Sequence, residues 1–360
     1  MEPGVVDLVR RAEKEGRYEL LVFCTPGLQR SCLSRAVAGA SVDLVLEVDM
    51  EGDHFARRPH PSEHVEASIE ARWVEQQKVL GDNLWNASKF RLNAIRVSCR
   101  HEQGVVHRKF HLEVGATDYR AHQGTTLAPN ALKAFRSAER GAPWCHLANA
   151  IGNAAILETA DGKIVCQRRS SRLGEASGRW VLPGGHPEPS NVATSIDVTQ
   201  GVWQEFLDAV KSELCDELNL PTCRVSDPVF LGLVRRKVDW RPTYACWCTT
   251  SLTSTEVEYL WMQGGKDTGE STMLYFLKIP AHDDDLLFPT DSYAMFFEAC
   301  GLRGQRAEHE TDQRSPLFPN EMVEDHRGAL CLYWIQRLFV AELLPMSHDV
   351  CEYFLRPIPK

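Results

Sequence analysis

The sequence predicts an α/β protein made of two units, with a smaller unit first. Three observations support this fold class. The chain has 360 residues, and roughly 150 residues per domain is usual. Short β-rich runs alternate with helical patterns along most of the chain. The pattern changes near Asn149, where closely spaced apolar runs joined by turn residues begin. We therefore expect two consecutive α/β units.

The first unit is expected to span residues 17–145, after a polar and flexible N-terminus at residues 1–16. Strands are predicted at residues 18–24, 42–48, 90–97 and 105–114, and helices at residues 62–80 and 130–139. Ser62 is the expected N-cap of the first of these helices. These elements suffice for a small α/β domain.

The second unit is expected to span residues 146–280. Strands are predicted at residues 151–157, 163–166, 180–182, 229–234, 243–250 and 273–277, and helices at residues 201–218 and 254–263. Asp161 and Gly162 mark the turn between the first two strands. Residues 281–360 are expected to form a loop-rich C-terminal extension with a closing helix at residues 324–344.

Composition narrows the classes of function. Lys plus Arg number 40 and Asp plus Glu number 49, so the net charge is −9. A protein that binds nucleic-acid backbones usually carries a basic excess, so no nucleic-acid partner is expected. The apolar runs are too short to span a bilayer, so no membrane partner is expected either. The start of the chain does not resemble a secretory signal, and the cysteines form no C-x-x-C pair. We expect a cytoplasmic protein, with the nucleus as the alternative.

The helix at residues 201–218 concentrates carboxylates beside an apolar side. At about 100° per residue, Glu205, Glu213, Asp216 and Glu217 share one arc. Glu213 and Glu217 lie one turn apart, where like charges repel by a few tenths of a kcal/mol. A solvated acidic face is one interpretation of this pattern. The other is a site for a hard divalent cation such as Mg²⁺, which prefers oxygen ligands.

A glycine turn upstream favours the cation site. Gly184 and Gly185 follow the short run at residues 180–182, and Glu188 comes three residues later. Glycines at such a turn let the backbone approach a ligand closely. We expect their N–H groups to receive phosphate oxygens. A glycine turn with a glutamate, followed by an E-x-x-x-E helix, is a far more specific pattern than either part alone.

These residues resemble the Nudix hydrolase family. Its motif runs from a glycine through a glutamate to R-E-x-x-E-E-x-G on a helix, and residues 184–188 and 212–219 match it. The resemblance implies a Nudix α/β/α sandwich with a mixed sheet, here preceded by the smaller α/β N-terminal domain. It also implies metal-dependent attack of water on a diphosphate linked to another group.

The match departs from the family pattern at three places. Ser212 stands where the family has arginine, with Lys211 beside it, and Asn219 replaces the terminal glycine. Asn is the next-best residue for a left-handed helix cap, and Pro221 fits a helix end. About twenty residues separate Gly185 from Glu205, so a loop is inserted within the motif.

These departures are similar to those of one branch, the UDP-glucose (UDP-galactose) pyrophosphatases. Segments that agree with this branch are KFRL at residues 89–92, ATDYR at 116–120, RRS at 168–170, GG at 264–265 with EST at 270–272, and GA at 328–329. The resemblance implies hydrolysis of UDP-glucose and UDP-galactose to UMP and hexose 1-phosphate. The implied partner is a small-molecule nucleotide sugar.

Carried over by position, Glu213 and Glu217 are the implied ligands of Mg²⁺, with Mn²⁺ as an alternative. A cation held there would withdraw charge from the diphosphate and lower the pKa of a bound water. Asp216 is the third expected catalytic residue. Asp216, Glu205 or Glu188 could each complete the metal shell or act as base, and the sequence does not decide among them.

Five residues are expected to bind substrate. Arg169 offers a planar fork of donors for phosphate, although it could also be a surface arginine. His186 either hydrogen-bonds the substrate or caps its loop, and Glu188 lies in the same segment. Trp85 and Tyr119 occupy positions where the resembling branch holds its nucleotide, and an aromatic face can stack on uracil. From the residues alone, both would be core aromatics.

Two alternatives to a UDP-sugar hydrolase stay open. One is a Nudix hydrolase of another nucleoside diphosphate derivative, such as ADP-ribose. The other is a catalytically silent module that binds a nucleotide sugar or a protein. Ser212 in place of arginine favours the silent module, and the presence of both Glu213 and Glu217 opposes it.

Overall fold

The larger sheet of the molecule is mixed and lies at the centre of a three-layer unit. The structure is a computed structural model that describes residues 5–15, 17–23, 40–81, 84–102, 105–139, 142–171, 173–192, 197–281, 296, 299–300 and 322–340. The strands follow the order β1-β8-β9-β5-β6-β10, with β7 paired to β6. Neighbours are antiparallel except β5 and β9, which are parallel. The strands are β1 (Tyr18–Phe23), β5 (Gly152–Glu158), β6 (Lys163–Arg169), β7 (Trp180–Val181), β8 (Val229–Arg236), β9 (Pro242–Thr249) and β10 (Ser271–Lys278).

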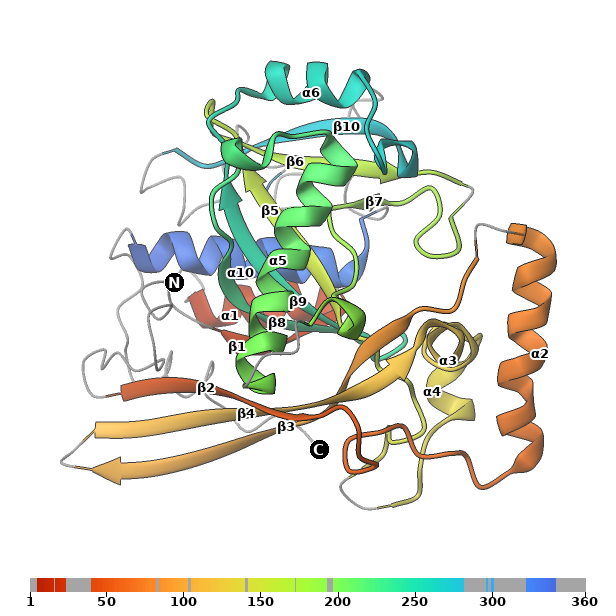
Figure 1. Ribbon diagram of the computed structural model, residues 1–360. Coiled ribbons are helices and arrows are strands. Elements are labelled where there is room, and N and C mark those ends of the chain that lie inside the picture. The colour runs from red at the N-terminus through yellow and green to blue at the C-terminus, as the bar shows by residue number, and fades with distance from the viewer. Residues whose placement is uncertain are drawn as a thin grey trace, which may run out of the picture.

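Helices cover both faces of this sheet, as Figure 1 shows. Helix α5 (Val198–Leu218) packs on one face, and α10 (Glu324–Val340) packs on the other. The central strand β5 serves both cores: Ile156 belongs to the α10 side, whereas Ala155 and Leu157 belong to the α5 side. A strand buried on both faces is apolar throughout. The predicted α/β/α sandwich with a mixed sheet is therefore confirmed.

A second, three-stranded sheet extends from this unit. It has the order β2-β4-β3, with β2 parallel and β3 antiparallel to β4. Its strands are β2 (Ala40–Asp49), β3 (Ser88–Glu102) and β4 (Val105–Asp118), and it is flanked by α2 (Glu63–Leu80), α3 (Tyr119–Gly124) and α4 (Ala131–Ala134). Apolar side chains of this sheet, including Phe90 and Phe110, join the core on the α5 side. The two sheets thus share one core.

Backbone hydrogen bonds fix β3 against the approach to β5. Ile151 N–H donates to Phe90 O over 2.8 Å, and Leu92 N–H donates to Asn149 O over 3.1 Å. Tyr119 N–H donates to Ala87 O over 2.9 Å, which ties the start of α3 to the start of β3. These bonds carry the first residues of β3 and α3 to the end of the larger sheet where β7 finishes.

The N-terminal part differs from the sequence prediction in two respects. Residues 1–16 were expected to be flexible, but residues 5–15 form helix α1 (Val5–Glu15). Val9 and Ala12, three positions apart on one face, are fully buried in the α10-side core. Strand β1 was grouped with the first unit, yet it pairs with β8 at the edge of the larger sheet. The apolar edge of β8 supplies the partner that the sequence alone could not locate.

The smaller helices also refine the prediction. Residues 130–139 were expected to be helical, but α4 has only four residues, and α3 was not predicted. Ser62 does occupy the N-cap of α2, although its side chain makes no capping hydrogen bond. Helix α6 (Ser254–Met262) begins with a capping box between Thr253 and Glu256. Short 3-10 turns are η2 (Pro189–Asn191), η3 (Thr222–Arg224) and η4 (Thr268–Glu270).

Helix α5 begins and ends at well-defined caps. The Asp197 side chain accepts from Thr199 N–H and Gln200 N–H at its start. Asn219 ends the helix in the left-handed conformation, with φ 54° and ψ 42°. Asn is tolerated there because its short polar side chain lowers the cost of positive φ. The prediction that Asn219 replaces a glycine cap is confirmed. Among the described helices, none is long and apolar enough to cross a membrane.

Candidate active site

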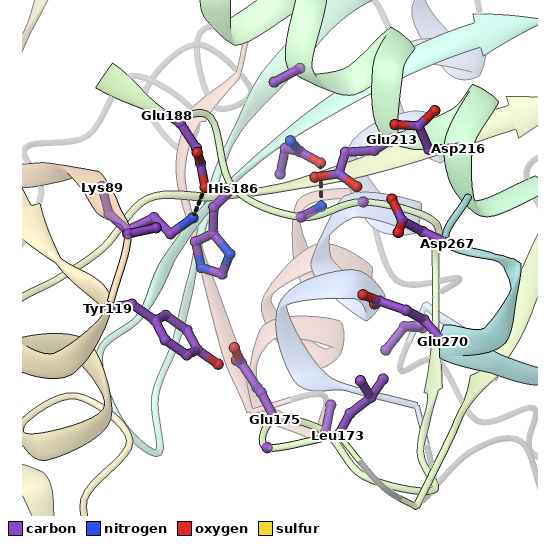
Figure 2. A pocket seen from close by; sticks show the side chains of 18 of the residues that line it. Lys89, Tyr119, Leu173, Glu175, His186, Glu188, Glu213, Asp216, Asp267 and Glu270 are labelled. Carbon is purple, nitrogen blue, oxygen red and sulfur yellow. Dashed lines mark hydrogen bonds and ion pairs between the residues drawn. The ribbon is translucent and has the colours of Figure 1, made fainter. Parts of the chain in front are cut away.

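A cavity of about 570 Å³ opens where the N-terminal sheet meets the end of β7. It is lined from both units. Its walls include Trp85, Lys89, Tyr119, Arg169, Glu175, His186, Glu188, Glu213, Asp216, Arg241 and Glu270. Figure 2 shows Glu213, Asp216, Asp267 and Glu270 on one side of the cavity, with Lys89, Tyr119 and His186 on the other. Every residue predicted to bind substrate lines this cavity.

The glycine turn forms the floor between the two sides. Gly184 has a φ of 147°, and a Cβ at this position would lie 2.5 Å from Asn153 O. Gly185 N–H donates to Asn153 Oδ1 over 2.9 Å. Leu182 N–H donates to His326 Nδ1 over 2.8 Å. Only glycine fits the first position, and the turn is held from β5 and α10.

The two motif glutamates meet this turn. Glu217 is 2% exposed, and its Oε2 accepts from Gly184 N–H over 2.9 Å and from Gln167 Nε2 over 2.8 Å. Glu213 lies directly against Gly185, because a Cβ there would come within 2.1 Å of Glu213 Oε1. Both motif carboxylates therefore face the glycine turn. One expectation is wrong. The N–H groups of Gly184 and Gly185 are already used by Glu217 and Asn153, so they do not receive phosphate.

Burial and mutual repulsion raise the pKa of both glutamates. Burial is the largest cause for Glu213, followed by the charges of Glu270 and Asp267, and together they raise its pKa to about 7. Burial and then the charge of Glu213 raise the pKa of Glu217 well above its ordinary value, against a lowering by Arg169. Arg169 Nη1 lies 4.0 Å from Glu217 Oε1. Ionising both groups therefore requires further positive charge.

The donor set at this end fits a hard divalent cation. Glu213 and Glu217 offer carboxylate oxygens that lack a full complement of positive partners. Gln167 Oε1 is buried beside Glu217 and has no hydrogen-bond partner in the described part of the chain. An orphaned buried oxygen next to two buried carboxylates is costly unless a ligand satisfies it. A bound cation with its waters would do so.

Two further acids stand at this end that sequence reasoning gave no role. Asp267 and Glu270 come from the loop around η4, and Figure 2 shows both pointing toward Glu213. Glu270 Oε2 lies 3.3 Å from Arg169 Nη2. The signal was present, because Glu270 belongs to the EST segment that matched the resembling branch. Its spacing from the helix motif alone could not show that it faces Glu213.

The three acids left open by the sequence now have distinct surroundings. Asp216 is paired with Lys266 Nζ at 2.6 Å. Glu188 is paired with Lys89 Nζ at 2.5 Å. Glu205 is 6% exposed, and its Oε1 accepts from Glu188 N–H over 2.8 Å. Burial raises the pKa of Glu205. Glu205 thus holds the segment that carries Glu188, and all three acids line the cavity.

The residues expected to bind substrate lie around the remaining wall. Trp85 is 69% exposed at the surface of the cavity. The Tyr119 hydroxyl accepts from Gln123 Nε2 over 2.8 Å. Arg169 Nε donates to Glu175 O over 3.2 Å, so its guanidinium spans from this loop to Glu217. Neither Trp85 nor Tyr119 is a simple core aromatic.

A second group of side chains has metal-ligand chemistry but a different electrostatic setting. Ligand atoms of His122, Glu175 and His186 lie within 4.8 Å of one another. Arg241 contacts Glu175 through Nη1 and lies 3.3 Å from His186 Nε2 through Nη2. Burial would raise the pKa of Glu175, but Arg241, His122 and Arg236 hold it well below its ordinary value. A guanidinium touching two of the three groups opposes a second cation. Sequence reasoning missed Glu175 and Arg241, which no motif marks.

Comparison with known proteins identifies the family of this chain. No protein-family model matches the chain. The chain is 32% identical over 287 residues to Nudix hydrolase 9 of Arabidopsis thaliana, which covers 76% of this chain and 86% of that protein. The chain belongs to the Nudix hydrolases. The resemblance to the Nudix hydrolases that residues 184–188 and 212–219 carry is therefore confirmed.

Other relatives of this Nudix hydrolase carry a more specific name. It is 32% identical over 231 residues to uridine diphosphate glucose pyrophosphatase NUDT22 of Homo sapiens, covering 62% of this chain and 74% of that protein. It is 33% identical over 232 residues to the protein of the same name in Mus musculus, covering 62% of this chain and 73% of that one. A solved structure, the MutT protein of Methanosarcina mazei Go1, covers 40% of this chain and 85% of its own at 16% identity, with a TM-score of 0.24. That score is too low to bear on the fold.

Proposed function

We propose that this Nudix hydrolase cleaves the diphosphate of UDP-glucose and UDP-galactose, with Mg²⁺ or Mn²⁺ as cofactor, to give UMP and hexose 1-phosphate. The observation that carries the proposal is the meeting of Glu213 and Glu217 at the glycine turn, beside a cavity that Glu213 lines together with two aromatic side chains. The relatives named for UDP-glucose support the choice of nucleotide sugar.

Glu213 and Glu217 would hold the cation. When bound, the cation supplies charge withdrawal from the diphosphate and a water of lowered pKa. Gln167 Nε2 and the backbone N–H of Gly184 both donate to Glu217 Oε2, so the carboxylate is held in place before substrate arrives. Such preorganisation removes a cost from binding and from the reaction.

Arg169 would bind the diphosphate. Its guanidinium lies between Glu217 and Glu270, at 4.0 Å and 3.3 Å, and so at the border of the acidic side of the cavity. A planar fork of donors matches two phosphate oxygens at once. Asp216, Glu188 or Glu205 would complete the metal shell or take a proton from water, and Glu270 joins these three as a candidate because it faces Glu213.

The nucleoside would lie toward Trp85 and Tyr119. A cavity of about 570 Å³ is in the range that holds a ligand of this size. Trp85 exposes most of its ring and can stack on a base. Because Tyr119 comes from α3, the N-terminal sheet and its helices would form part of the substrate site.

The test is a substrate panel with the purified 360-residue chain. UDP-glucose, UDP-galactose and ADP-ribose are incubated with Mg²⁺, and nucleoside monophosphate release is measured with and without a chelator. We expect UMP from both UDP-sugars and no release after chelation. Cleavage of ADP-ribose alone would replace the substrate assignment. Binding of UDP-glucose without any cleavage would show a silent binding module.

A further inference from the structure

Glu175 lines the end of the cavity remote from Glu213, and within the described part of the chain its Oε2 accepts no hydrogen bond. Its Oε1 is taken by two arginines, since Arg236 Nη2 donates to it over 3.2 Å and Arg241 Nη1 also contacts it. His122 Nε2 lies 3.9 Å from Oε2. This distance is longer than a hydrogen bond. Figure 2 shows this carboxylate pointing toward Tyr119 and His186. The two arginines fix the group and leave Oε2 as an acceptor.

Donors flank that acceptor. The Tyr119 oxygen accepts from Gln123 Nε2, which leaves its own proton for another partner. His186 Nε2 faces the Arg241 donor at 3.3 Å, so the proton of the neutral ring lies on Nδ1. Burial and then Arg241 lower the pKa of His186 well below its ordinary value, which keeps the ring neutral. This end of the cavity therefore offers donors on both sides of an ionised acceptor.

The arrangement suits a neutral ring with a complementary edge. A cation is opposed by Arg241, and a phosphate is opposed by the Glu175 charge. The imide edge of uracil presents a carbonyl, an N–H and a second carbonyl in sequence. Cytosine places an unprotonated nitrogen where uracil has the N–H, and adenine does the same at its ring nitrogen. A fixed carboxylate accepts a hydrogen bond from the uracil N–H, whereas it repels the lone pair on the unprotonated ring nitrogen of cytosine or adenine.

We propose that Glu175 selects the nucleobase: its Oε2 accepts the N3–H of a uracil that lies against Tyr119, with Tyr119 and His186 as donors to the flanking carbonyls. The inference rests on the proposed function for the presence of a uridine nucleotide, and it adds the residue that distinguishes uracil from other bases. Glu175 is a specificity determinant, and it takes no part in the reaction at the diphosphate.

The experiment measures equilibrium binding, without hydrolysis, of UMP, CMP, N3-methyl-UMP and 2′-deoxy-UMP. With the wild-type chain we expect UMP to bind about 10- to 100-fold more tightly than CMP and N3-methyl-UMP, the range for a hydrogen bond to a charged group. We expect 2′-deoxy-UMP to bind like UMP. Equal binding of UMP and N3-methyl-UMP, or a loss confined to 2′-deoxy-UMP, would overturn the inference, because the donor would then be absent or a ribose hydroxyl.

Variants provide the second arm. Glu175→Gln should bring the UMP-to-CMP ratio close to one, since an amide can donate to cytosine as well as accept from uracil. Tyr119→Phe should lower UMP affinity while keeping the N3-methyl discrimination. Ser177→Ala, an exposed change in the same loop, is the matched control and should leave the ratio unchanged. An unchanged ratio in Glu175→Gln would refute the assignment, and the nucleotide series with wild-type protein stands even if a variant fails to fold.

The outcomes separate this inference from the proposed reaction. A chain that prefers UMP over CMP but fails to cleave UDP-glucose would retain the Glu175 assignment and lose the proposed activity. A chain that cleaves UDP-glucose yet binds UMP and CMP equally would retain the activity and lose the Glu175 assignment.

Discussion

Two glutamates of the site, the buried Glu217 and the half-buried Glu175, show opposite electrostatics. Burial alone would raise the pKa of both Glu217 and Glu175. At Glu217 the neighbouring charge of Glu213 raises the pKa further, with Arg169 only partly opposing it. At Glu175 two arginines reverse the effect and lower the pKa. Burial disfavours the charged form of both carboxyl groups, and the charge of the neighbouring side chains determines whether the folded protein stabilises that form.

The comparison assigns different ligands to the two ends. The Glu213–Glu217 end is electrostatically incomplete, so it calls for a cation from outside the chain. At the other end, Arg236 and Arg241 balance the charge of Glu175. This end therefore suits a neutral group that donates a hydrogen bond to an acceptor. A nucleotide sugar with its cation would satisfy both ends at once, which is why the proposed function uses the whole cavity.

The largest expected effect comes from removing a proposed metal ligand at the Glu213–Glu217 end. Glu217→Gln should lower kcat/KM for UDP-glucose on the order of 10³-fold, because losing a metal ligand removes several kcal/mol of transition-state stabilisation. Steady-state kinetics of UMP release provide the measurement. Asp208→Asn, an exposed acid on the same helix, is the control and should retain activity. A loss below tenfold in Glu217→Gln would remove Glu217 from the site.

The next effect comes from displacing Glu213 without deleting it. Gly185→Ala would place a Cβ 2.1 Å from Glu213 Oε1, so the carboxylate must move. We expect Mg²⁺ affinity to fall by about 10- to 100-fold, as for changes in groups that orient metal ligands. Gly269→Ala is the control, because nothing lies within 4 Å of a Cβ there. Calorimetric titration of both variants decides, and equal affinities would show that Glu213 does not bind the metal.

A pH effect should distinguish the two ends in the metal-free protein. Because the pKa of Glu213 is raised to about 7, the folded chain keeps a proton that the unfolded chain releases above about pH 4.3. Stability from this group is therefore present at pH 5 and lost as the pH rises toward 7. The difference in the free energy of unfolding between Glu213→Gln and wild type should therefore shift by about 2 kcal/mol in favour of the variant from pH 5 to pH 8.

Urea unfolding at both pH values, with a chelator present, measures that gain. Glu175 has a lowered pKa, so Glu175→Gln should behave in the opposite way. Its carboxylate stabilises the fold above the pKa of an unfolded glutamate, and the stabilisation disappears only under more acidic conditions. Identical pH profiles for the two variants would contradict the electrostatic contrast between the ends.

The smallest expected effect lies at the exposed wall. Trp85→Ala should raise KM for UDP-glucose about tenfold with little change in kcat, since stacking on a base contributes about 1–3 kcal/mol and Trp85 is 69% exposed. Val79→Ala, another exposed apolar residue of the N-terminal part, is the control. An unchanged KM would move the base away from Trp85.

The sequence predicted the parts of the site that are local in the chain. The E-x-x-x-E spacing of Glu213 and Glu217 places them on one side of a helix. The Gly184-Gly185 pair indicates a turn from local sequence alone. Asn219 could be assigned as a left-handed cap because few other residues tolerate that conformation. Strands and helices with clear periodicity were placed within a few residues. These features depend on neighbours a few positions apart.

What the sequence could not give depends on contacts between distant segments. Glu175 acquires its lowered pKa from Arg236 and Arg241, more than sixty residues away, and no local pattern marks such a group. The glycine N–H groups were assigned to phosphate, yet Asn153 and Glu217 occupy them. Helix α1 was missed because its segment is largely polar, although Val9 and Ala12 are buried in the core and Leu8 packs against it.

The most direct test of the central claim is a Mn²⁺ titration followed by electron paramagnetic resonance of the free ion. Wild-type chain, Glu217→Gln and Glu175→Gln are compared at the same pH without substrate. We predict that wild type and Glu175→Gln bind the ion with the same affinity and that Glu217→Gln loses the binding. Retained binding in Glu217→Gln together with loss in Glu175→Gln would place the cation at the wrong end and contradict the account.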